Sequence, residues 1–266
     1  MRDLPALASA LIPIVAQAGA AIMRVYEDEA FIVQRKEDDS PLTLADLESQ
    51  RVIIDGLEGI TPDIPILSEE SAQAPWSERR AWRELWVVDP LDGTREFVKR
   101  NGEFTVNIAL VQEHEPVLGI VAAPALGLLY WGARDAGAFS HHRGAARRPI
   151  KVSPPQNPPR VIGSRSHMSP QTAAYLAGLG PHVMTAIGSS LKFCWVAEGK
   201  AELYPRFGPT SEWDTAAGQA LLEAAGGQVT RPDGHRLRYN CRESLINGDF
   251  LAFSDASVLG VARRLA

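Results

Sequence analysis

The chain has 266 residues, a formal net charge of −5, 45% hydrophobic residues and 22% charged residues. These values are typical of a globular protein and exclude a disordered or fibrous chain, and the length allows one large domain or two packed subdomains. A pI near 5.7 argues against a protein that binds duplex nucleic acid, but it is compatible with a local basic pocket for a small anion.

The first segment predicts an amphipathic helix. Its apolar residues fall on one helical face, and they are Leu4, Leu7, Ala8, Leu11, Val15, Ala18 and Ile22. The Ala16–Ala18 stretch resembles a signal-peptide cleavage site, but Asp3 cancels the charge of Arg2 and prolines interrupt the apolar stretch. We therefore expect the helix to stay in the folded protein. No apolar run approaches the ~18 residues of a membrane span, so we expect no integral membrane segment.

A second helix is predicted from Leu44 to Gly56, after a polar stretch over residues 36–43. Its apolar positions are Leu44, Leu47, Val52, Ile53 and Ile54. Thr43 is a suitable N-cap, with Asp46 three residues further on as in a capping box. An acidic, proline-containing loop follows and ends at Ser68–Ser71.

The hydrophobic period then changes to that of strands. Leu85–Val88 predicts a buried strand that runs directly into Asp89. Three further strands are expected at Val106–Val111, Val117–Ala122 and Leu128–Gly132, which together predict a meander. A proline-rich stretch over residues 153–159 predicts a linker.

Strands and helices alternate after this linker. We expect strands at residues 160–163, 183–187 and 201–204, and helices at residues 170–178, 191–198 and 212–225. The sequence therefore predicts a layered α/β fold of two packed subdomains, residues 1–152 and 153–266. Cys194 and Cys241 lack metal-ligand spacing, and we interpret them as two buried thiols of a cytoplasmic protein.

The most informative residues are carboxylates at the ends of strands and loops. Asp89 and Asp92 follow an apolar strand, Glu69 precedes that strand, and Asp214 begins a helical segment. Two carboxylates so close repel each other unless a cation lies between them, and oxygen ligands suit Mg²⁺. Each residue also has a plain interpretation on its own: a turn at Asp92-Gly93, a helix cap at Asp214 and a solvated loop at Glu69.

Candidate anion-binding residues lie in the second half. Gly188–Lys192 opens a helix, where free backbone N–H groups and the lysine could hold a phosphate, and Arg206 adds a second positive charge. The glycine and lysine spacing does not match a Walker A loop. Acidic residues in one half and cations in the other together fit a phosphate ester held by metal ions and basic groups.

Four blocks of sequence resemble the inositol monophosphatase family of lithium-sensitive, metal-dependent phosphatases. They are Lys36–Asp46, Ser68–Ser71, Trp86–Thr94 and Trp213–Gly218. The resemblance implies a sugar-phosphatase-like αβαβα sandwich. No serine, cysteine or histidine nucleophile is evident, so we expect direct in-line attack by water activated by two metal ions.

Within the family, Gly188–Ala201 and Tyr204–Thr210 resemble the bacterial CysQ branch of 3′(2′),5′-bisphosphate nucleotidases. This resemblance implies hydrolysis of the 3′-phosphate of adenosine 3′,5′-bisphosphate to AMP, and of 3′-phosphoadenylyl sulfate to adenylyl sulfate, in sulfur assimilation and nucleotide recycling. The alternatives are a phosphatase for inositol 1-phosphate or fructose 1,6-bisphosphate, and a sensor that binds the nucleotide without turnover.

The resemblance also implies roles for the acidic residues. Glu69, Asp89 and the Leu91 carbonyl would hold one Mg²⁺, and Asp89, Asp92 and Asp214 would hold a second. Li⁺ and Ca²⁺ are expected to inhibit.

Asp46 and Thr94, with Glu69, would position and deprotonate the attacking water, and Glu70 is a candidate contact for a third, weaker ion. The residues predicted to contact the substrate are Leu91, Asp92, Gly93, Thr94, His167, Ser189, Lys192, Arg206 and Asp214. The expected partner is a small phosphonucleotide and not a nucleic acid, and a homodimer is left open. The expected location is the cytoplasm, with peripheral attachment to the inner membrane also left open.

Overall fold

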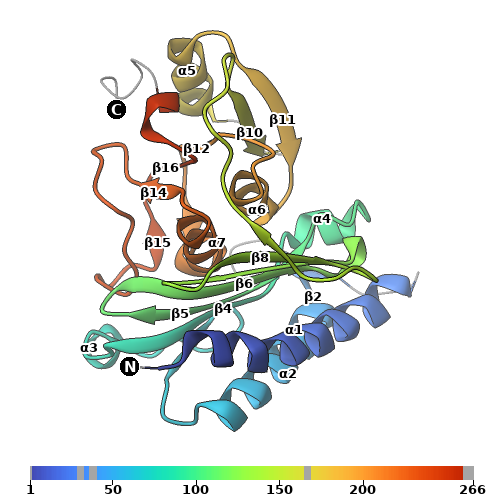
Figure 1. Cartoon of the computed structure of the whole chain (residues 1–266). Helices are drawn as coiled ribbons and strands as arrows, with labels where there is room; N and C mark the ends of the chain where they lie inside the picture. Colours follow the sequence, from blue (N-terminus) through green and yellow to red (C-terminus); the bar gives the residue numbers. More distant parts are fainter. Residues whose placement is uncertain (1, 29–32, 36–40, 165–168, 260–266) are drawn as a thin grey trace.

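The computed structural model describes residues 2–28, 33–35, 41–164 and 169–259. These residues form five layers in the order helix, sheet, helix, sheet, helix (Figure 1). The expected αβαβα sandwich is therefore confirmed.

A seven-stranded sheet in the order β3-β4-β5-β6-β7-β8-β9 forms the larger β layer. Its strands are β3 (Ile66–Ser68), β4 (Glu84–Asp92), β5 (Thr105–Gln112), β6 (Glu115–Ala123), β7 (Leu128–Ala133), β8 (Gly137–His142) and β9 (Arg148–Ile150). Only β3 and β4 pair in parallel; every other neighbouring pair is antiparallel. The predicted meander is thus confirmed, and it extends through β8 and β9, which the sequence analysis did not include.

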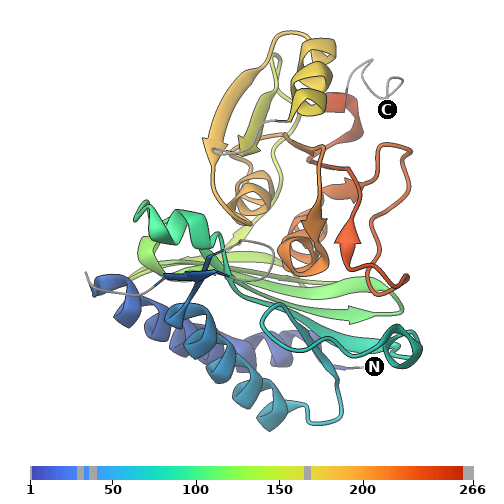
Figure 2. The ribbon, with the colours of Figure 1, turned by 180° about the vertical axis from the view of Figure 1, so that it is seen from behind.

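Two helices, α1 (Leu4–Glu27) and α2 (Leu44–Ile60), cover one face of this sheet (Figure 2). By length and composition α1 could cross a membrane, contrary to the sequence-based expectation, yet its apolar stripe packs into the core like that of a soluble-protein helix. In α2, only Ile53 of the five predicted apolar positions is fully buried; Leu44 and Leu47 are 56% and 46% exposed. The predicted apolar face of α2 is therefore wrong near its start.

The opposite face of the sheet is covered by α6 (Leu191–Ala197) and α7 (Glu212–Ala224), both from the second half of the chain. Close approach of α7 depends on Gly119 in β6, because a Cβ there would lie 2.2 Å from the Ala217 carbonyl oxygen. Phe193 on α6 and Val87 on β4 belong to the same buried cluster. The two halves therefore share one hydrophobic core.

A five-stranded sheet in the order β11-β10-β12-β16-β14 lies beyond α6 and α7. Its strands are β10 (Arg160–Ser164), β11 (Val183–Ile187), β12 (Leu203–Arg206), β14 (Gln228–Thr230) and β16 (Phe250–Phe253), and helix α5 (Pro170–Leu179) covers its outer face. The remaining elements are short: β1 (Val33–Arg35), β2 (Pro41–Thr43), α3 (Trp76–Arg79), α4 (Thr94–Val98), η1 (Pro124–Leu126), β13 (Thr210–Ser211), β15 (Ile246–Asn247) and η2 (Ala256–Leu259).

Residues 151–159 connect the two sheets without regular secondary structure. Ser153, near the start of this connection, and Arg160, directly after it, both donate to the carboxylate of the buried Glu202. The subdomain boundary between residues 152 and 153 stays a prediction.

Candidate active site

The end of β4 carries the first group of carboxylates. The pairing between β4 and β5 shifts register between Asp89 and Asp92, so the chain bulges at the Pro90-Leu91 step. Two bonds hold this bulge: the Ser49 hydroxyl donates to the Pro90 carbonyl at 2.7 Å, and the Leu91 N–H donates to Asp89 Oδ1 at 3.1 Å. The bulge allows both aspartates to turn toward the same end of the sheet.

Glu69 reaches this end from the neighbouring strand. β3 runs parallel to β4, with Ser68 opposite Val88, and the Glu69 N–H donates to the Val88 carbonyl at 3.1 Å. The carboxyl ends of parallel strands meet at one edge of a sheet. Glu69 and Asp89 are therefore brought together by the register of the two strands.

Asp46 lies in the first turn of α2, where it completes a full capping box. Its Oδ2 accepts the Thr43 N–H at 2.8 Å and the Thr43 hydroxyl at 2.7 Å. The Thr94 hydroxyl lies 3.4 Å from Asp46 Oδ1 and 3.5 Å from the Leu91 carbonyl oxygen. Thr94 and Asp46 therefore face each other at the end of β4, across a separation at the outer limit of a hydrogen bond.

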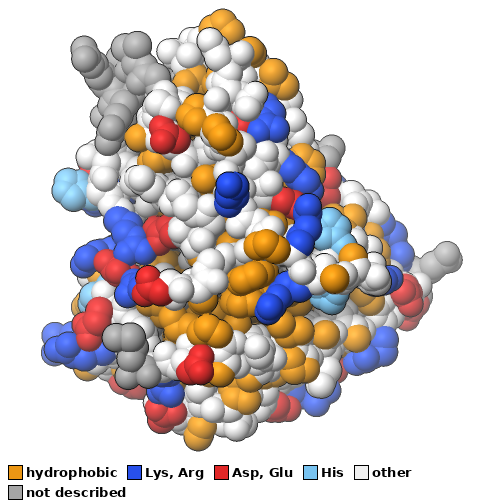
Figure 3. All heavy atoms as spheres, in the orientation of Figure 1, with side chains coloured by type: hydrophobic (Ala, Val, Ile, Leu, Met, Phe, Trp, Pro, Cys, Tyr) orange, Lys and Arg blue, Asp and Glu red, His pale blue; other side chains and the backbone are white. Residues whose placement is uncertain are grey.

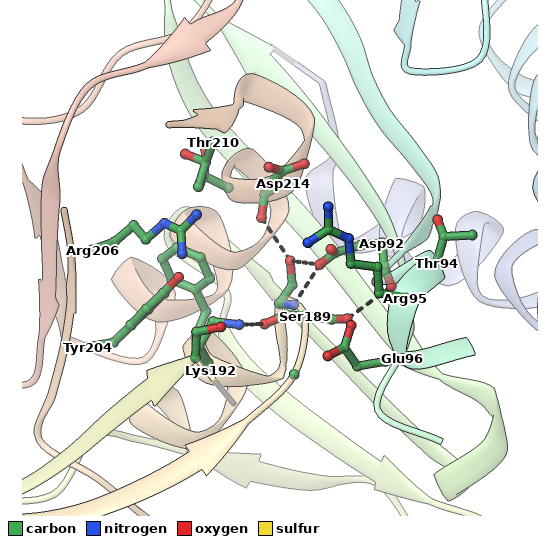
Figure 4. Close-up of a pocket in the computed structure, with 16 residues that line it drawn as sticks. Asp92, Thr94, Arg95, Glu96, Ser189, Lys192, Tyr204, Arg206, Thr210 and Asp214 are labelled. Carbon is green, nitrogen blue, oxygen red and sulfur yellow. Dashed lines mark hydrogen bonds between the residues drawn. The ribbon is translucent and has the colours of Figure 1, made fainter. Parts of the chain in front are cut away.

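Asp214 lies in the first turn of α7 and also completes a capping box, since it accepts the Ser211 N–H at 2.8 Å. The plain interpretation of Asp214 as a helix-capping residue is thus correct as far as it goes. Because α7 packs on the sheet, this cap also brings the carboxylate to the cavity beside Asp92 (Figure 4).

Electrostatic repulsion marks these carboxylates as one group. Burial raises the pKa of Asp89 well above its ordinary value, and the nearby charges of Glu69 and Asp92 raise it further. Burial and Asp92 raise the pKa of Asp214 to about 8. Such mutual repulsion in a buried place favours a bound cation.

The donor set fits magnesium, which takes hard oxygen ligands. Within the described residues, however, no three acidic, histidine or cysteine side chains already surround one point. Three of the carboxylates accept backbone N–H groups: Asp46 from Thr43, Asp92 from Ser190 and Asp214 from Ser211.

Two cations lie across the cavity from the carboxylates. Lys192 on α6 is buried, donates to the Ser189 carbonyl at 2.6 Å and lies over the Tyr204 ring at 5.5 Å. Burial lowers the pKa of Lys192 to about 8; Asp92 opposes this shift and Arg206 adds to it. The Arg206 Nε is buried and donates to no partner among the described residues. Figure 4 shows both side chains on the side of the cavity opposite Asp92 and Thr94.

The phosphate site predicted at the start of α6 stays a prediction, and two of its backbone groups already have partners in the chain. The Gly188 N–H donates to Glu103 at 2.8 Å, and the Ser190 N–H donates to Asp92 at 2.7 Å. Carboxylates of the same chain therefore occupy backbone groups that the sequence analysis assigned to a ligand, and the helix is only seven residues long.

The cavity of about 230 Å³ brings together most of the predicted substrate contacts. Its lining includes Asp92, Gly93, Thr94, Ser189, Lys192, Arg206 and Asp214. His167 lies outside the described residues. The lining also includes residues outside the predicted substrate contacts, among them Glu96, Ser190 and Tyr204. Ser190 follows the predicted Ser189 directly, but nothing in the sequence distinguishes its role.

A second cavity, of about 480 Å³, lies between α1 and the β6–β7 connection. It is mainly apolar, with Met23, Leu128 and Leu129 in its lining and Arg24 and Arg143 among its charged residues. The face seen in Figure 1 carries exposed hydrophobic side chains with basic residues beside them (Figure 3). Glu27 is the one acidic residue among the described lining, so this cavity lacks the carboxylates that the first one has.

Comparisons with known proteins agree with this geometry. The model of the inositol monophosphatase family matches residues 3–257. The 3′(2′),5′-bisphosphate nucleotidase CysQ of Salmonella typhimurium is 53% identical over 234 residues, which cover 88% of this chain and 94% of that protein. CysQ of Escherichia coli strain K12 is 51% identical with the same coverage. The crystal structure of CysQ from Bacteroides thetaiotaomicron superposes with a TM-score of 0.82 at 39% identity, covering 94% of this chain and 97% of that one.

Proposed function

The chain belongs to the inositol monophosphatase family, and from that premise we propose that it is a 3′(2′),5′-bisphosphate nucleotidase. It removes the 3′-phosphate of adenosine 3′,5′-bisphosphate to give AMP and phosphate, and it acts in the same way on 3′-phosphoadenylyl sulfate. Its place is in the cytoplasm, in sulfur assimilation and nucleotide recycling. The similarity to the CysQ proteins supports this substrate class, because it extends over most of both chains.

The pair of cations carries the proposal for a substrate with a second anionic group. Burial lowers the pKa of Lys192, and the nearby Arg206 lowers it further. The Arg206 Nε is a buried donor with no acceptor among the described residues. Two positive groups of this kind destabilise the free protein unless an anion lies between them. The 5′-phosphate of the nucleotide supplies such an anion, whereas inositol 1-phosphate has only the phosphate that is removed.

The carboxylates supply the second half of the site. Glu69, Asp89 and the Leu91 carbonyl would hold one magnesium ion, and Asp89, Asp92 and Asp214 would hold another. The chemistry that magnesium supplies when bound is a lowered pKa for the attacking water and neutralisation of charge on the phosphate. A third ion at Glu70, and inhibition by Li⁺ and Ca²⁺, follow from the family resemblance and stay predictions.

Asp46 and Thr94 orient the attacking water in this proposal. Thr43 holds the Asp46 carboxylate through two hydrogen bonds, so its Oδ1 stays directed at the Thr94 hydroxyl. A water in contact with both oxygens would donate a hydrogen bond to Asp46 Oδ1. Asp46 would then take up the proton as the water attacks phosphorus in line with the leaving 3′-oxygen.

Phosphate release from three substrates tests the proposal. Purified protein with Mg²⁺ is given adenosine 3′,5′-bisphosphate, inositol 1-phosphate and fructose 1,6-bisphosphate in parallel. We expect kcat/KM for the nucleotide to exceed the others by more than about a hundredfold, or ~2.7 kcal/mol. A preference for inositol 1-phosphate would overturn the substrate assignment of Ser189, Lys192 and Arg206. Binding of the nucleotide without turnover would identify a sensor.

A further inference from the structure

Ser190 connects two acidic residues that come from different parts of the fold. It is 2% exposed and immediately precedes α6. Its hydroxyl lies 2.9 Å from Asp92 Oδ2, at the end of β4, and 2.8 Å from the Asp214 carbonyl oxygen, in the first turn of α7. One buried side chain therefore contacts both acidic elements of the site.

Hydrogen bonding at Asp92 is concentrated on one oxygen. Asp92 Oδ2 accepts the Ser190 N–H at 2.7 Å and the Ser190 hydroxyl at 2.9 Å, with Thr105 Oγ1 at 3.3 Å and Asn107 Nδ2 at 3.4 Å as longer contacts. A carboxylate oxygen has about two lone-pair directions; the Ser190 N–H occupies one on Oδ2, and the Ser190 hydroxyl faces the other. No hydrogen bond from a described residue reaches Asp92 Oδ1.

The Ser190 hydroxyl is itself held in place. Asn107 Nδ2 donates to its oxygen at 3.0 Å, so the hydroxyl proton is left for either Asp92 Oδ2 or the Asp214 carbonyl. Both acceptors lie within hydrogen-bond distance, and one proton cannot satisfy both at once. The hydroxyl thereby links the position of the β4 end to the position of the α7 start.

We propose that Ser190 is a positioning residue for cation binding: it holds Asp92 Oδ2 so that Oδ1 stays available to the ion, and it ties Asp92 to the helix that carries Asp214. This inference rests on the proposed metal-dependent function. Groups that hydrogen-bond to metal ligands orient those ligands, and their loss commonly weakens metal affinity by ~10- to 100-fold.

Mg²⁺ binding in the absence of substrate tests the role of Ser190. Isothermal titration calorimetry and the Mg²⁺-dependent rise in Tm are measured for the wild type, S190A, S190T and S254A. We expect at least about tenfold weaker Mg²⁺ binding in S190A and recovery in S190T, which keeps the hydroxyl. Ser254 is the matched control, because it is a buried serine whose hydroxyl has no partner among the described residues. S254A should bind Mg²⁺ like the wild type.

Kinetics separate positioning from a general structural effect. In S190A the Mg²⁺ concentration for half-maximal activity should rise by the same factor as the dissociation constant, while KM for the nucleotide at saturating Mg²⁺ stays within about twofold of wild type. If S190A does not fold, S190C replaces it, because a thiol has similar size but donates only weakly.

The outcomes distinguish this inference from the proposed function. Wild-type Mg²⁺ affinity in S190A, or in S190C where S190A does not fold, would overturn the role of Ser190 and leave the nucleotidase proposal intact. Mg²⁺ binding that depends on Ser190 in a protein that does not hydrolyse the bisphosphate would support the role of Ser190 and overturn the nucleotidase proposal. A wild type that binds no Mg²⁺ would overturn both.

Discussion

Gly93 and Ser189 lie in such close contact that a Cβ on Gly93 would be 2.0 Å from the Ser189 hydroxyl oxygen. Gly93 has φ +86° and immediately precedes α4, while Ser189 has φ +48° and lies just before α6. The Ser189 hydroxyl donates to the Asp92 carbonyl at 3.0 Å. The two turns that line the cavity are therefore packed directly against each other.

Substitution G93A should disturb this contact. The left-handed backbone conformation at this position destabilises alanine by about 1 kcal/mol or more relative to glycine. The added methyl group must also displace the Ser189 side chain. We expect a fall in the free energy of unfolding and a loss of at least about tenfold in kcat/KM, because the turn carries Asp92 and Thr94. Denaturant unfolding and steady-state kinetics measure the two effects.

G137A is the matched control for G93A. Gly137 has φ +81°, but nothing lies within 4 Å of the position of a Cβ there. G137A should therefore show only the backbone cost and keep wild-type kcat/KM. Equal activity in the two variants would contradict the importance of the Gly93–Ser189 contact.

Substitution D89N should abolish catalysis rather than reduce it slightly. Asp89 is buried among Glu69, Asp92 and Asp214, and the amide that replaces it removes one negative charge from the proposed ligand set. We expect kcat/KM to fall by more than about tenfold and the Mg²⁺-dependent rise in Tm to disappear. D55N, on the exposed side of α2, should leave both unchanged. A D89N enzyme that keeps more than about a tenth of the wild-type kcat/KM would rule out the role of Asp89 as a metal ligand.

The pH dependence of substrate preference should report Lys192. Its pKa is lowered to about 8, so the free enzyme loses this positive charge as the pH rises through that value. We compare kcat/KM for adenosine 3′,5′-bisphosphate with kcat/KM for adenosine 3′-monophosphate at pH 7 and pH 9, about one unit below and above this pKa. We expect the ratio of the two values to fall as the pH rises. The ratio should be low and constant in K192M. A constant ratio in the wild type would argue against a contact between Lys192 and the 5′-phosphate.

Lys192 should also reduce the stability of the free protein. A pKa lowered from 10.5 to about 8 means that the folded protein binds the proton more weakly than the unfolded chain does, at a cost of about 3 kcal/mol below pH 8. K192M should therefore raise the free energy of unfolding at pH 7. This gain should shrink as the pH rises from about 8 toward 10.5, where the wild-type lysine is neutral in the folded state.

K151M provides the comparison, because Lys151 is an exposed lysine outside the cavity. Denaturant unfolding measures the free energy of unfolding of both variants at about pH 7 and about pH 10. The first pH lies below the lowered pKa of Lys192, and the second lies above it. A K192M protein less stable than the wild type at pH 7 would mean that packing of the lysine stem and its bond to Ser189 outweigh the cost of burying the charge.

The local sequence pattern predicted those secondary-structure elements that depend only on residues close together in the chain. The apolar stripe of α1, the capping box at Thr43 and the apolar strand ahead of Asp89 can all be predicted from the sequence, because a helix face or a cap depends on residues only a few positions apart. The same pattern misjudged Leu44 and Leu47, because burial depends on which face of α2 meets the sheet. It also did not reveal β8 and β9, which are held by pairing with the strand beside them.

The sequence by itself determined the chemistry of the site: the carboxylates at a strand end, the two cations of the second half and their resemblance to a phosphatase family. Only the tertiary structure decided which of these groups meet. Packing of α7 on the sheet places Asp214 beside Asp92, although the two are far apart in the chain. The fold also directs the Gly188 and Ser190 N–H groups at the start of α6 to Glu103 and Asp92, partners that local spacing does not indicate. Partners of buried polar groups are set by long-range packing, which no local spacing encodes.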